Sequence, residues 1–494
     1  MEIQNETKEK KETKNQLKNG ILSLIGASFM NLIYPSIFSL CTFVVYQTSY
    51  IKNNGGNVNI NHTMFYYPIV LLFQSIFGLI AGFIYSKIEV HWTNLLGSIL
   101  VILGSLLLYV SKYFALDMVS MAVDGIAIAI IMFPATTNAC KYFMKHIGLV
   151  NGIIETVISL GSTFFAFIGE KIINPDNIES REDDFLYDNY IAKKVKTFLL
   201  IQMACVVGSY IIGFILIKQY NDDDDKNNEN NAINNAEQAK EIKTNEVINL
   251  DNNNNNIEQA KNITSNDGIN TVNIITNVNK EIKNEDINKI RKEKLKKALK
   301  SWTFWRYNII SLCQSPITDM VFAMYRSIGE SKRINQKTLQ LIGTLNFVVE
   351  LVFSFLYGIL CDYVNFKILL FSMNIIGTIV GFTYCLTFNN SFFFALLTLL
   401  ITVEGAAYYS IKDYHLMKVF GTDIYIDISG FVCLFTGIIV IILTFITYYV
   451  EEMLDDKDKA YWIMFCIFGG INGIGVVLGF FESDDPFVYE ENKN

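Results

Sequence analysis

A series of long apolar runs, separated by short polar segments, is the feature that most constrains the fold of this chain. Each run is about 20 residues or somewhat longer, which is the length that a helix needs to cross the ~30 Å hydrocarbon core of a membrane. The pattern predicts an all-α polytopic membrane protein with twelve transmembrane helices. The runs lie at 20–46, 64–85, 93–111, 117–138, 149–170, 196–217, 302–325, 338–360, 366–387, 391–411, 425–449 and 460–481.

Composition agrees with a membrane protein and disfavours several other classes. Of the 494 residues, 51% are hydrophobic and 18% are charged, whereas about 25% charge is usual in soluble domains. The net charge of −8 gives no indication of nucleic-acid binding. None of the eight cysteines forms a CxxC pair, so we expect buried thiols, no metal site and no cofactor. The first run has no signal-peptide cleavage site and should remain as an anchor.

The charged segments divide the chain into five parts. We expect a cytoplasmic N-terminal tail at 1–19, six-helix halves at 20–217 and 301–481, a disordered cytoplasmic linker at 218–300 and a cytoplasmic C-terminal tail at 482–494. The linker ends in a basic stretch next to the seventh run, and basic residues beside a membrane end indicate the cytoplasmic side. Lys87, Lys141, Lys145 and, in the loop between the tenth and eleventh runs, Lys412 and Lys418 agree with this orientation, whereas a basic loop at 332–337 opposes it.

Three motifs of the first half recur in the second half in the same order, at spacings of 276, 280 and 273 residues. Any one match could arise by chance, but the three together predict an internal duplication, with a solute site between the halves. The pairs are Gly82-Phe-Ile-Tyr-Ser86-Lys87 with Gly358-Ile-Leu-Cys-Asp362-Tyr363, Val123-Asp124-Gly125 with Val403-Glu404-Gly405, and Phe143-Met144-Lys145-His146-Ile147-Gly148 with Leu416-Met417-Lys418-Val419-Phe420-Gly421.

The first of these motifs resembles the loop signature of the major facilitator superfamily, Gly-x-x-x-Asp-(Arg/Lys)-x-Gly-(Arg/Lys)-(Arg/Lys). The second copy keeps Gly358 and Asp362, and the first copy keeps Gly82 and Lys87 but has Ser86 where Asp is expected. The resemblance implies two parallel six-helix repeats and a cytoplasmic gate, in which the glycines allow close helix approach and the carboxylate caps a helix or pairs with a cation.

Two further stretches are similar to the oxalate/formate antiporter and monocarboxylate transporter branch of that superfamily. They are Ala139-Cys140-Lys141-Tyr142-Phe143 through Gly148-Leu149-Val150-Asn151-Gly152, and Ser301-Trp302-Thr303-Phe304-Trp305. The resemblance implies a monomeric secondary transporter of an organic acid, including monocarboxylates such as pantothenate, coupled to H⁺. We expect the plasma membrane rather than an internal membrane, with the lipid bilayer and a small-molecule solute as the partners.

Ionisable and polar side chains within the apolar runs are the candidate solute or proton pathway, because such groups are costly at membrane depth. Burial favours the neutral, protonated form of a carboxyl group, so Glu404 and Asp124 are the first candidates for carrying a proton. The alternative is that these groups pair with Ser, Thr or backbone atoms and only fix helix packing. The candidates are Asn31, Tyr34, Asp124, Asn138, Glu155, Gln314, Asp319, Glu350 and Glu404.

One feature departs from the branch, because we find no Lys or Arg within the runs at 338–360 and 425–449. The nearest cations, Arg306 and Arg326, could simply extend to the membrane interface. A neutral or cationic metabolite such as an amino acid therefore stays open, and so does a membrane sensor that transports nothing. An enzyme and a channel are disfavoured, because the four histidines are placed in loops or at helix ends and no filter-like segment is present.

Overall fold

The computed structural model describes residues 2–181, 186–220, 289–332, 334–384, 390–454, 457–482 and 485–487, without the side chains at 2–13, 33–42, 323, 327, 330–331 and 457–458. Most of the predicted linker, parts of the C-terminal tail and the side chains of Cys41 and Cys385 lie outside the described residues. Within the described ranges every regular element is helical. These helices belong to one unit, Met1–Gln219 with Lys294–Asn494, and Tyr220–Glu293 form a second unit.

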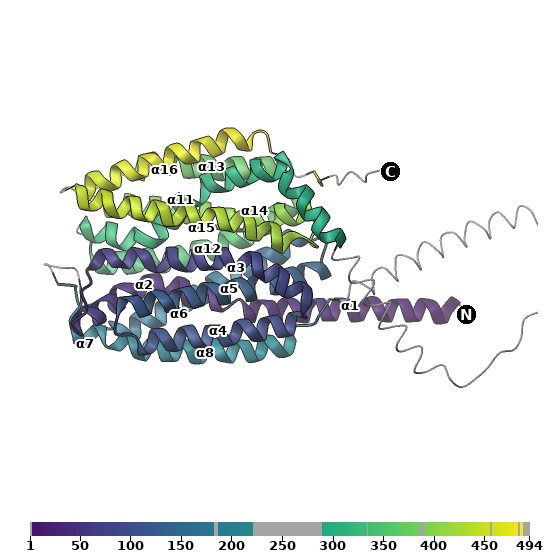
Figure 1. Ribbon diagram of the computed structural model, residues 1–494, viewed down its shortest axis with the longest axis horizontal. Helices are drawn as coiled ribbons and strands as arrows, with labels where there is room; N and C mark the ends of the chain where they lie inside the picture. The colour runs from purple at the N-terminus through teal and green to yellow at the C-terminus, as the bar shows by residue number, and fades with distance from the viewer. Residues whose placement is uncertain are drawn as a thin grey trace, which may run out of the picture. The chain divides into compact units, whose positions relative to one another are not determined.

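Beyond the first run, the helices of the first half follow the predicted runs closely (Figure 1). A short 3₁₀ helix, η1 (Ile60–Phe65), precedes the second run, and a single helical turn, α7 (Asn189–Ala192), precedes the sixth. The long helices are α1 (Glu2–Met30), α2 (Ile33–Asn53), α3 (Tyr66–Lys87), α4 (Val90–Val110), α5 (Phe114–Tyr142), α6 (Ile147–Ile173) and α8 (Lys194–Leu216).

The second half contains six long helices, one at each predicted run. They are α11 (Trp302–Ser331), α12 (Gln336–Tyr363), α13 (Phe366–Thr383), α14 (Ser391–Phe420), α15 (Tyr425–Met453) and α16 (Lys457–Gly479).

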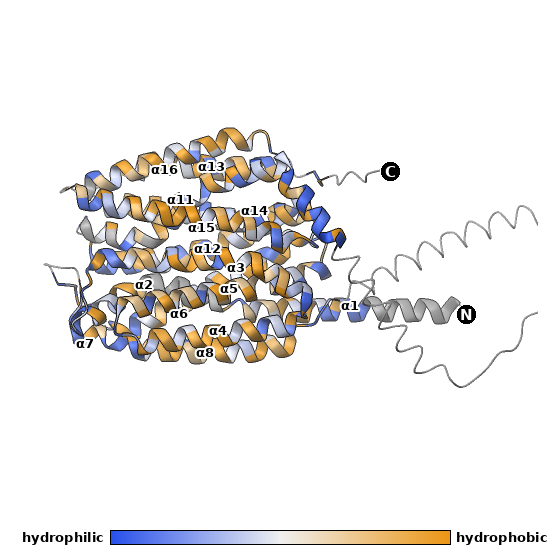
Figure 2. Ribbon diagram, in the orientation of Figure 1, coloured by the Kyte–Doolittle hydropathy of each residue, from blue (hydrophilic) through white to orange (hydrophobic). Residues whose placement is uncertain are grey.

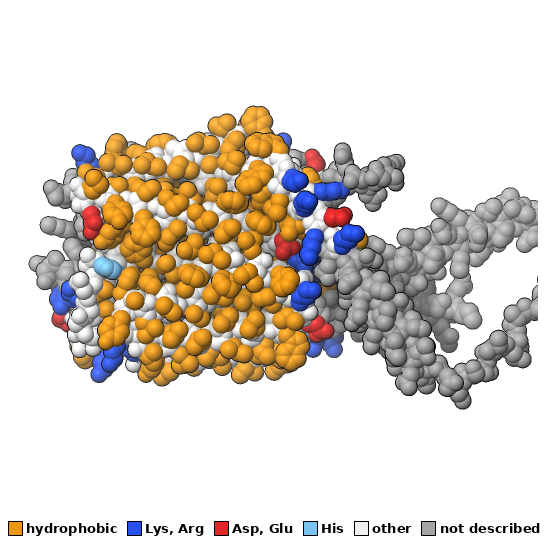
Figure 3. Space-filling model, in the orientation of Figure 1, with side chains coloured by type: hydrophobic (Ala, Val, Ile, Leu, Met, Phe, Trp, Pro, Cys, Tyr) orange, Lys and Arg blue, Asp and Glu red, His pale blue; other side chains and the backbone are white. Residues whose placement is uncertain are grey.

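Ten of the described helices are long and apolar enough to cross a membrane. Figure 2 shows the apolar residues along the helices, and Figure 3 shows apolar side chains over the lateral face with basic side chains gathered mainly at one end. Large side chains such as those of Ile99, Phe167 and Val477 are exposed, as expected where lipid replaces water. The chain is therefore an all-α, multi-pass membrane protein.

Three boundaries differ from the expectations. The run at 20–46 is two helices rather than one, with a turn at Asn31–Leu32. Pro35 explains the break, because its ring clashes with the carbonyl group four residues earlier, at Asn31. The N-terminal tail is helical, since α1 begins at Glu2, and the end of the predicted linker is helical at 289–300.

Helix packing joins the two halves at two crossings. Within the first half α3 and α4 pack on α5, and within the second half α12 and α13 pack on α14. Between the halves, α6 packs on α12 and α3 packs on α15. Both crossings are close: a Cβ atom on Gly358 of α12 would lie 2.5 Å from the Cα of Gly152 on α6, and one on Gly430 of α15 would lie 2.8 Å from the backbone carbon of Gly78 on α3. Glycine is therefore required for the helices to approach so closely.

Candidate functional site

Asp319 is held between the two halves. Its side chain, on α11, is 2% exposed and accepts hydrogen bonds from the hydroxyl groups of Tyr67 on α3 (3.1 Å) and Tyr409 on α14 (3.2 Å). The two hydroxyl groups lie 3.3 Å apart. A buried carboxyl group therefore joins α3 of the first half to α11 and α14 of the second.

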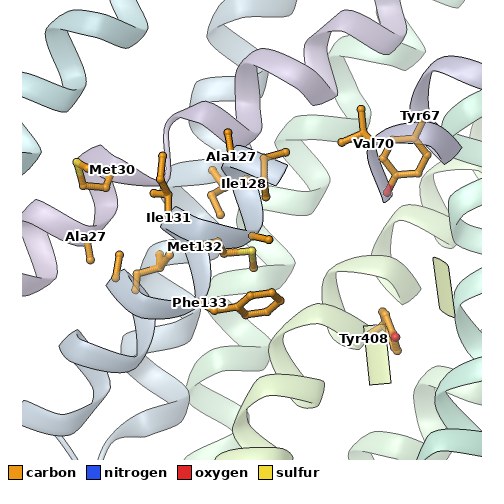
Figure 4. Packing of buried hydrophobic residues seen from close by; sticks show 14 of the residues in the cluster. Ala27, Met30, Tyr67, Val70, Ala127, Ile128, Ile131, Met132, Phe133 and Tyr408 are labelled. Atoms are coloured by element: carbon orange, nitrogen blue, oxygen red, sulfur yellow. The ribbon is translucent and has the colours of Figure 1, made fainter. Parts of the chain in front are cut away.

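Lys412 places a cation beside this carboxyl group. Its ammonium nitrogen lies 5.9 Å from the ring centre of Tyr408, 5.7 Å from that of Tyr409 and 3.6 Å from the carboxylate of Asp413. The side chain is only 4% exposed. In Figure 4, Tyr408 of α14 and Tyr67 of α3 appear in the buried cluster that contains residues of both halves.

The expectation that Lys412 lies in a cytoplasmic loop was wrong, because it is buried within α14 and is a cation of the interior in addition to Arg306 and Arg326. The tenth run ends at 411, but α14 continues to Phe420 and buries both Lys412 and His415. The helix extends past the end of the apolar run because its last turns pack against neighbouring helices. Lys412 and His415 therefore contact other protein groups and not lipid. His415 is accordingly stacked between the rings of Tyr307 (4.3 Å) and Phe366 (4.1 Å), and not in a loop. In the sequence, the spacing of Tyr408 and Lys412 is one helical turn, and this spacing could have indicated that Lys412 belongs to the helix.

A buried polar stripe on α11 faces the same region. Asn308, Ser311, Ser315 and Asp319 recur at helical spacing, and Ser311 lies within 2.6 Å of the Tyr408 hydroxyl group. The Nε2 atom of Gln314 and the Oγ atom of Ser315 are buried without a hydrogen-bond partner. Buried polar groups are nearly always paired in folded proteins. This part of α11 therefore holds two buried polar atoms without a hydrogen-bond partner.

Glu404 and Asp124 lie in different surroundings. Glu404 of α14 is fully buried and accepts hydrogen bonds from Thr318 of α11 and from Asn472 of α16 (3.4 Å). Asp124 of α5 points at Gly104 of α4, and its Oδ1 atom has no hydrogen-bond partner. Glu404 is thus bonded to the residue directly before Asp319 on α11, whereas Asp124 lies inside the first half.

Glu155 and Glu350 form a second acidic group at the crossing of α6 and α12. Both side chains are buried. The charges of Asp413, Glu350 and Lys412 all act on Glu155. The structure therefore brings Glu350 near Glu155, and it brings Glu155 and Asp319 into the electrostatic surroundings of Lys412.

The remaining uncharged candidates lie elsewhere. Asn138 of α5 donates to the carbonyl oxygen of Lys218 (2.8 Å) and so ties α5 to the segment after α8. Asn31 donates to the carbonyl oxygen of Ala27 (2.9 Å), and its Oδ1 atom is buried without a partner. Tyr34 begins α2, and its side chain lies outside the described part of the structure.

The loop-motif residues occupy the ends of the two crossings. Asp362 accepts hydrogen bonds from the backbone N–H groups of Gly148 (3.0 Å) and Leu149 (2.9 Å), which caps the first turn of α6. A Cβ atom on Gly82 would lie 2.3 Å from a carboxylate oxygen of Asp427 on α15. Lys87 is exposed at the end of α3.

The described residues contain no group of three or more His, Cys, Asp or Glu side chains that could hold a metal ion. The six cysteines described there are free thiols. No protein-family model and no curated protein matches this chain.

Proposed function

We propose that the protein is a secondary active transporter that moves a small organic acid across the membrane by alternating access, together with a proton. The observation that carries the proposal is the buried charged centre shared by both halves, in which Asp319 binds Tyr67 and Tyr409 beside Lys412. Ionisable groups at this depth are costly, and they typically mark a solute or ion pathway. A centre shared by two halves can be opened to either side when the halves move.

The arrangement of helices supports the major facilitator plan with twelve crossings. The α1–α2 pair and α11 supply the first and seventh crossings in addition to the ten apolar helices. The packing of α3 on α5 corresponds to that of α12 on α14, and the α3–α15 crossing corresponds to the α6–α12 crossing. This correspondence is what two repeats related by a pseudo-twofold axis would produce.

Lys412 favours an organic acid over a neutral solute. A buried ammonium group needs a counter-charge, which Asp413 supplies at 3.6 Å. A solute carboxylate can take the same position, so we assign Lys412 the role of holding a monocarboxylate, with pantothenate as one example. The donors on Gln314 and Ser315 would then bind the polar part of the solute.

The buried carboxyl groups favour coupling to protons. Asp319 and Glu155 lie in the electrostatic surroundings of Lys412, with Glu350 near Glu155 and Glu404 near Asp319, and a single ammonium group cannot compensate four carboxylates in an apolar interior. Most of these carboxyl groups are therefore neutral at any one time and exchange protons as the site opens. Glu404, bonded to Thr318, is our first choice for the coupling group.

The decisive experiment is uptake by purified protein in proteoliposomes, with and without an inward proton gradient. The panel contains pantothenate, lactate, pyruvate, formate, oxalate and several amino acids. Saturable uptake of one acid that rises with the gradient supports the proposal. Selective uptake of an amino acid would show that the solute belongs to the alternative class and is not an organic acid. If the folded protein transported none of these solutes, the result would favour a membrane sensor. We expect a monomer, with the plasma membrane as its location.

A further inference from the structure

A buried network of polar side chains joins the two halves at the end of α6 opposite the Asp362 cap. We name it the polar lock and define it by five residues: Tyr46 of α2, Glu170 of α6, Tyr187, Arg326 of α11 and Gln340 of α12. The Nη1 atom of Arg326 lies 3.3 Å from one carboxylate oxygen of Glu170. The other carboxylate oxygen accepts from Tyr46 (3.1 Å) and Gln340 (3.2 Å).

The arginine is enclosed rather than extended to the membrane interface. Arg326 is 5% exposed, its guanidinium lies 5.4 Å from the ring centre of Tyr46, and its Nη2 atom donates to the hydroxyl group of Tyr187 (3.2 Å). Tyr46, Glu170 and Tyr187 come from the first half, whereas Arg326 and Gln340 come from the second. Separation of the halves at this end therefore breaks the ion pair.

The polar lock is one of two attachments between α6 and the second half, and its position on α6 indicates its function. The same helix is tied to the second half at its start, where Asp362 binds Gly148 and Leu149. Glu170 lies 22 residues further along α6 than Gly148, which corresponds to roughly 33 Å of helix. Alternating access requires the halves to part at one end while they stay joined at the other. Both ends are joined here, so each transport cycle must break the two attachments in turn.

A buried ion pair is hard to break when nothing replaces the lost partner, because the remaining charge is left uncompensated. The guanidinium of Arg326 presents a planar fork of donors that matches a carboxylate. A carboxylate that arrives at this end has the same chemistry as the side chain of Glu170. It can therefore take the place of Glu170 on Arg326, whereas a neutral amide cannot supply the charge.

We propose that the polar lock is a gate, and that a carboxylate opens it by displacing Glu170 from Arg326. The proposal rests on the proposed transport of an organic acid, and it adds a second anion position, distinct from Lys412. It explains how a carrier with buried charge at its centre could admit acids in preference to neutral solutes. Arg326 would act before the solute reaches α14.

The test measures access to the interior and not transport. Ala166 is buried one helical turn before Glu170 on α6. The reporter is the thiol introduced by Ala166→Cys in the full chain in proteoliposomes, and its alkylation by a membrane-impermeant maleimide is followed by mass spectrometry. The maleimide is applied on the face that carries the loop between α6 and α8.

Adding Glu170→Gln, which removes the charge and keeps the shape, should raise the alkylation rate several-fold, while Glu170→Asp should stay close to the parent. Lys171→Gln, at the exposed neighbouring position, is the matched control and should change nothing. An unchanged alkylation rate in the Glu170→Gln variant would overturn the proposal that the polar lock is a gate.

The second arm leaves the lock intact and so does not depend on the folding of a lock variant. Acetate should raise the alkylation rate of Ala166→Cys, and acetamide should not. Equal effects of acetate and acetamide, or no effect of acetate, would overturn the carboxylate step. Loss of all uptake in the transport panel, with this alkylation pattern intact, would count against the proposed function and leave the gate standing.

Discussion

The surroundings of Lys412 define the chemistry of the site at the scale of single residues. Its ammonium group lies near the rings of Tyr408 and Tyr409 and the carboxylate of Asp413, and it donates to the Sγ atom of Cys433 (3.8 Å). Aromatic faces and a single carboxylate stabilise a buried cation and still leave it able to exchange one anion for another. Lys418, two turns later on α14, is exposed and lacks this enclosure.

Lys412→Gln should therefore reduce kcat/KM for uptake of the transported acid by at least about tenfold, which corresponds to ~1.4 kcal/mol or more of lost interaction. The measurement is initial uptake rate against acid concentration in proteoliposomes. Lys418→Gln is the matched control on the same helix and should transport normally. Undiminished uptake by folded Lys412→Gln would remove this lysine from the solute site.

Glu404 and Asp124 occupy matching motifs but should behave differently. Glu404→Gln should lose the stimulation of uptake by a proton gradient while still exchanging labelled for unlabelled solute, because exchange requires no net proton movement. Asp124→Asn should keep the stimulation, since Asp124 faces α4 inside the first half. Loss of the stimulation in Asp124→Asn alone would reverse this assignment.

At the scale of helices, the packing of one helix on another depends on close backbone contacts and on ion pairs at the helix ends. The crossing of α6 and α12 depends on Gly358, where a Cβ atom would lie 2.5 Å from the Cα of Gly152. The segment after α16 is also held against the second half: Glu482 is fully buried and pairs with Arg306 of α11, and its carboxylate lies 3.6 Å from His415 of α14.

Gly358→Ala should destabilise the protein by about 1–3 kcal/mol, because overpacking shifts the backbone of one helix. The readout is the thermal unfolding temperature in detergent. Gly208→Ala on α8 is the control, since a Cβ atom there meets nothing within 4 Å. Equal unfolding temperatures for the two variants would mean that the crossing tolerates a methyl group.

Stability should also depend on pH through Glu482. Burial works to raise the pKa of this carboxyl group, but the imidazole of His415 nearby and the hydrogen bond from Arg306 outweigh it and hold the pKa below its usual value. The stabilisation is therefore complete above the ordinary range of Glu and is lost as pH falls through the lower folded-state pKa. Thermal unfolding against pH should show this loss in the parent and not in Glu482→Gln. Identical pH profiles would contradict it.

At the scale of the whole molecule, the two halves meet through α6, α12, α3 and α15, and Asp319 lies among the groups that join them. The residues at 222–288 lie between the halves in sequence, and their composition is Asn-rich with few aromatic side chains. Such a composition favours a tether over a domain with its own core.

Deletion of 222–288 should therefore leave the uptake rate within about twofold of the parent, as expected when only the effective concentration of one half near the other changes. Uptake is compared at equal amounts of inserted protein. A membrane sensor that signals through this segment would lose its function on the same deletion. Uptake that disappears although both halves remain assembled would assign the segment a direct part in transport.

The sequence by itself determined the all-α membrane class and the position of most of the long helices, because the bilayer requires long apolar runs and allows no unpaired backbone. It also singled out Asp319, Glu155, Glu350 and Glu404 as buried acids. Only the tertiary structure decided which charges meet. The burial of Lys412 and the pairing of Arg326 with Glu170 depend on contacts between helices far apart in the chain, and the hydropathy of a single run does not specify which face of a helix meets which neighbour.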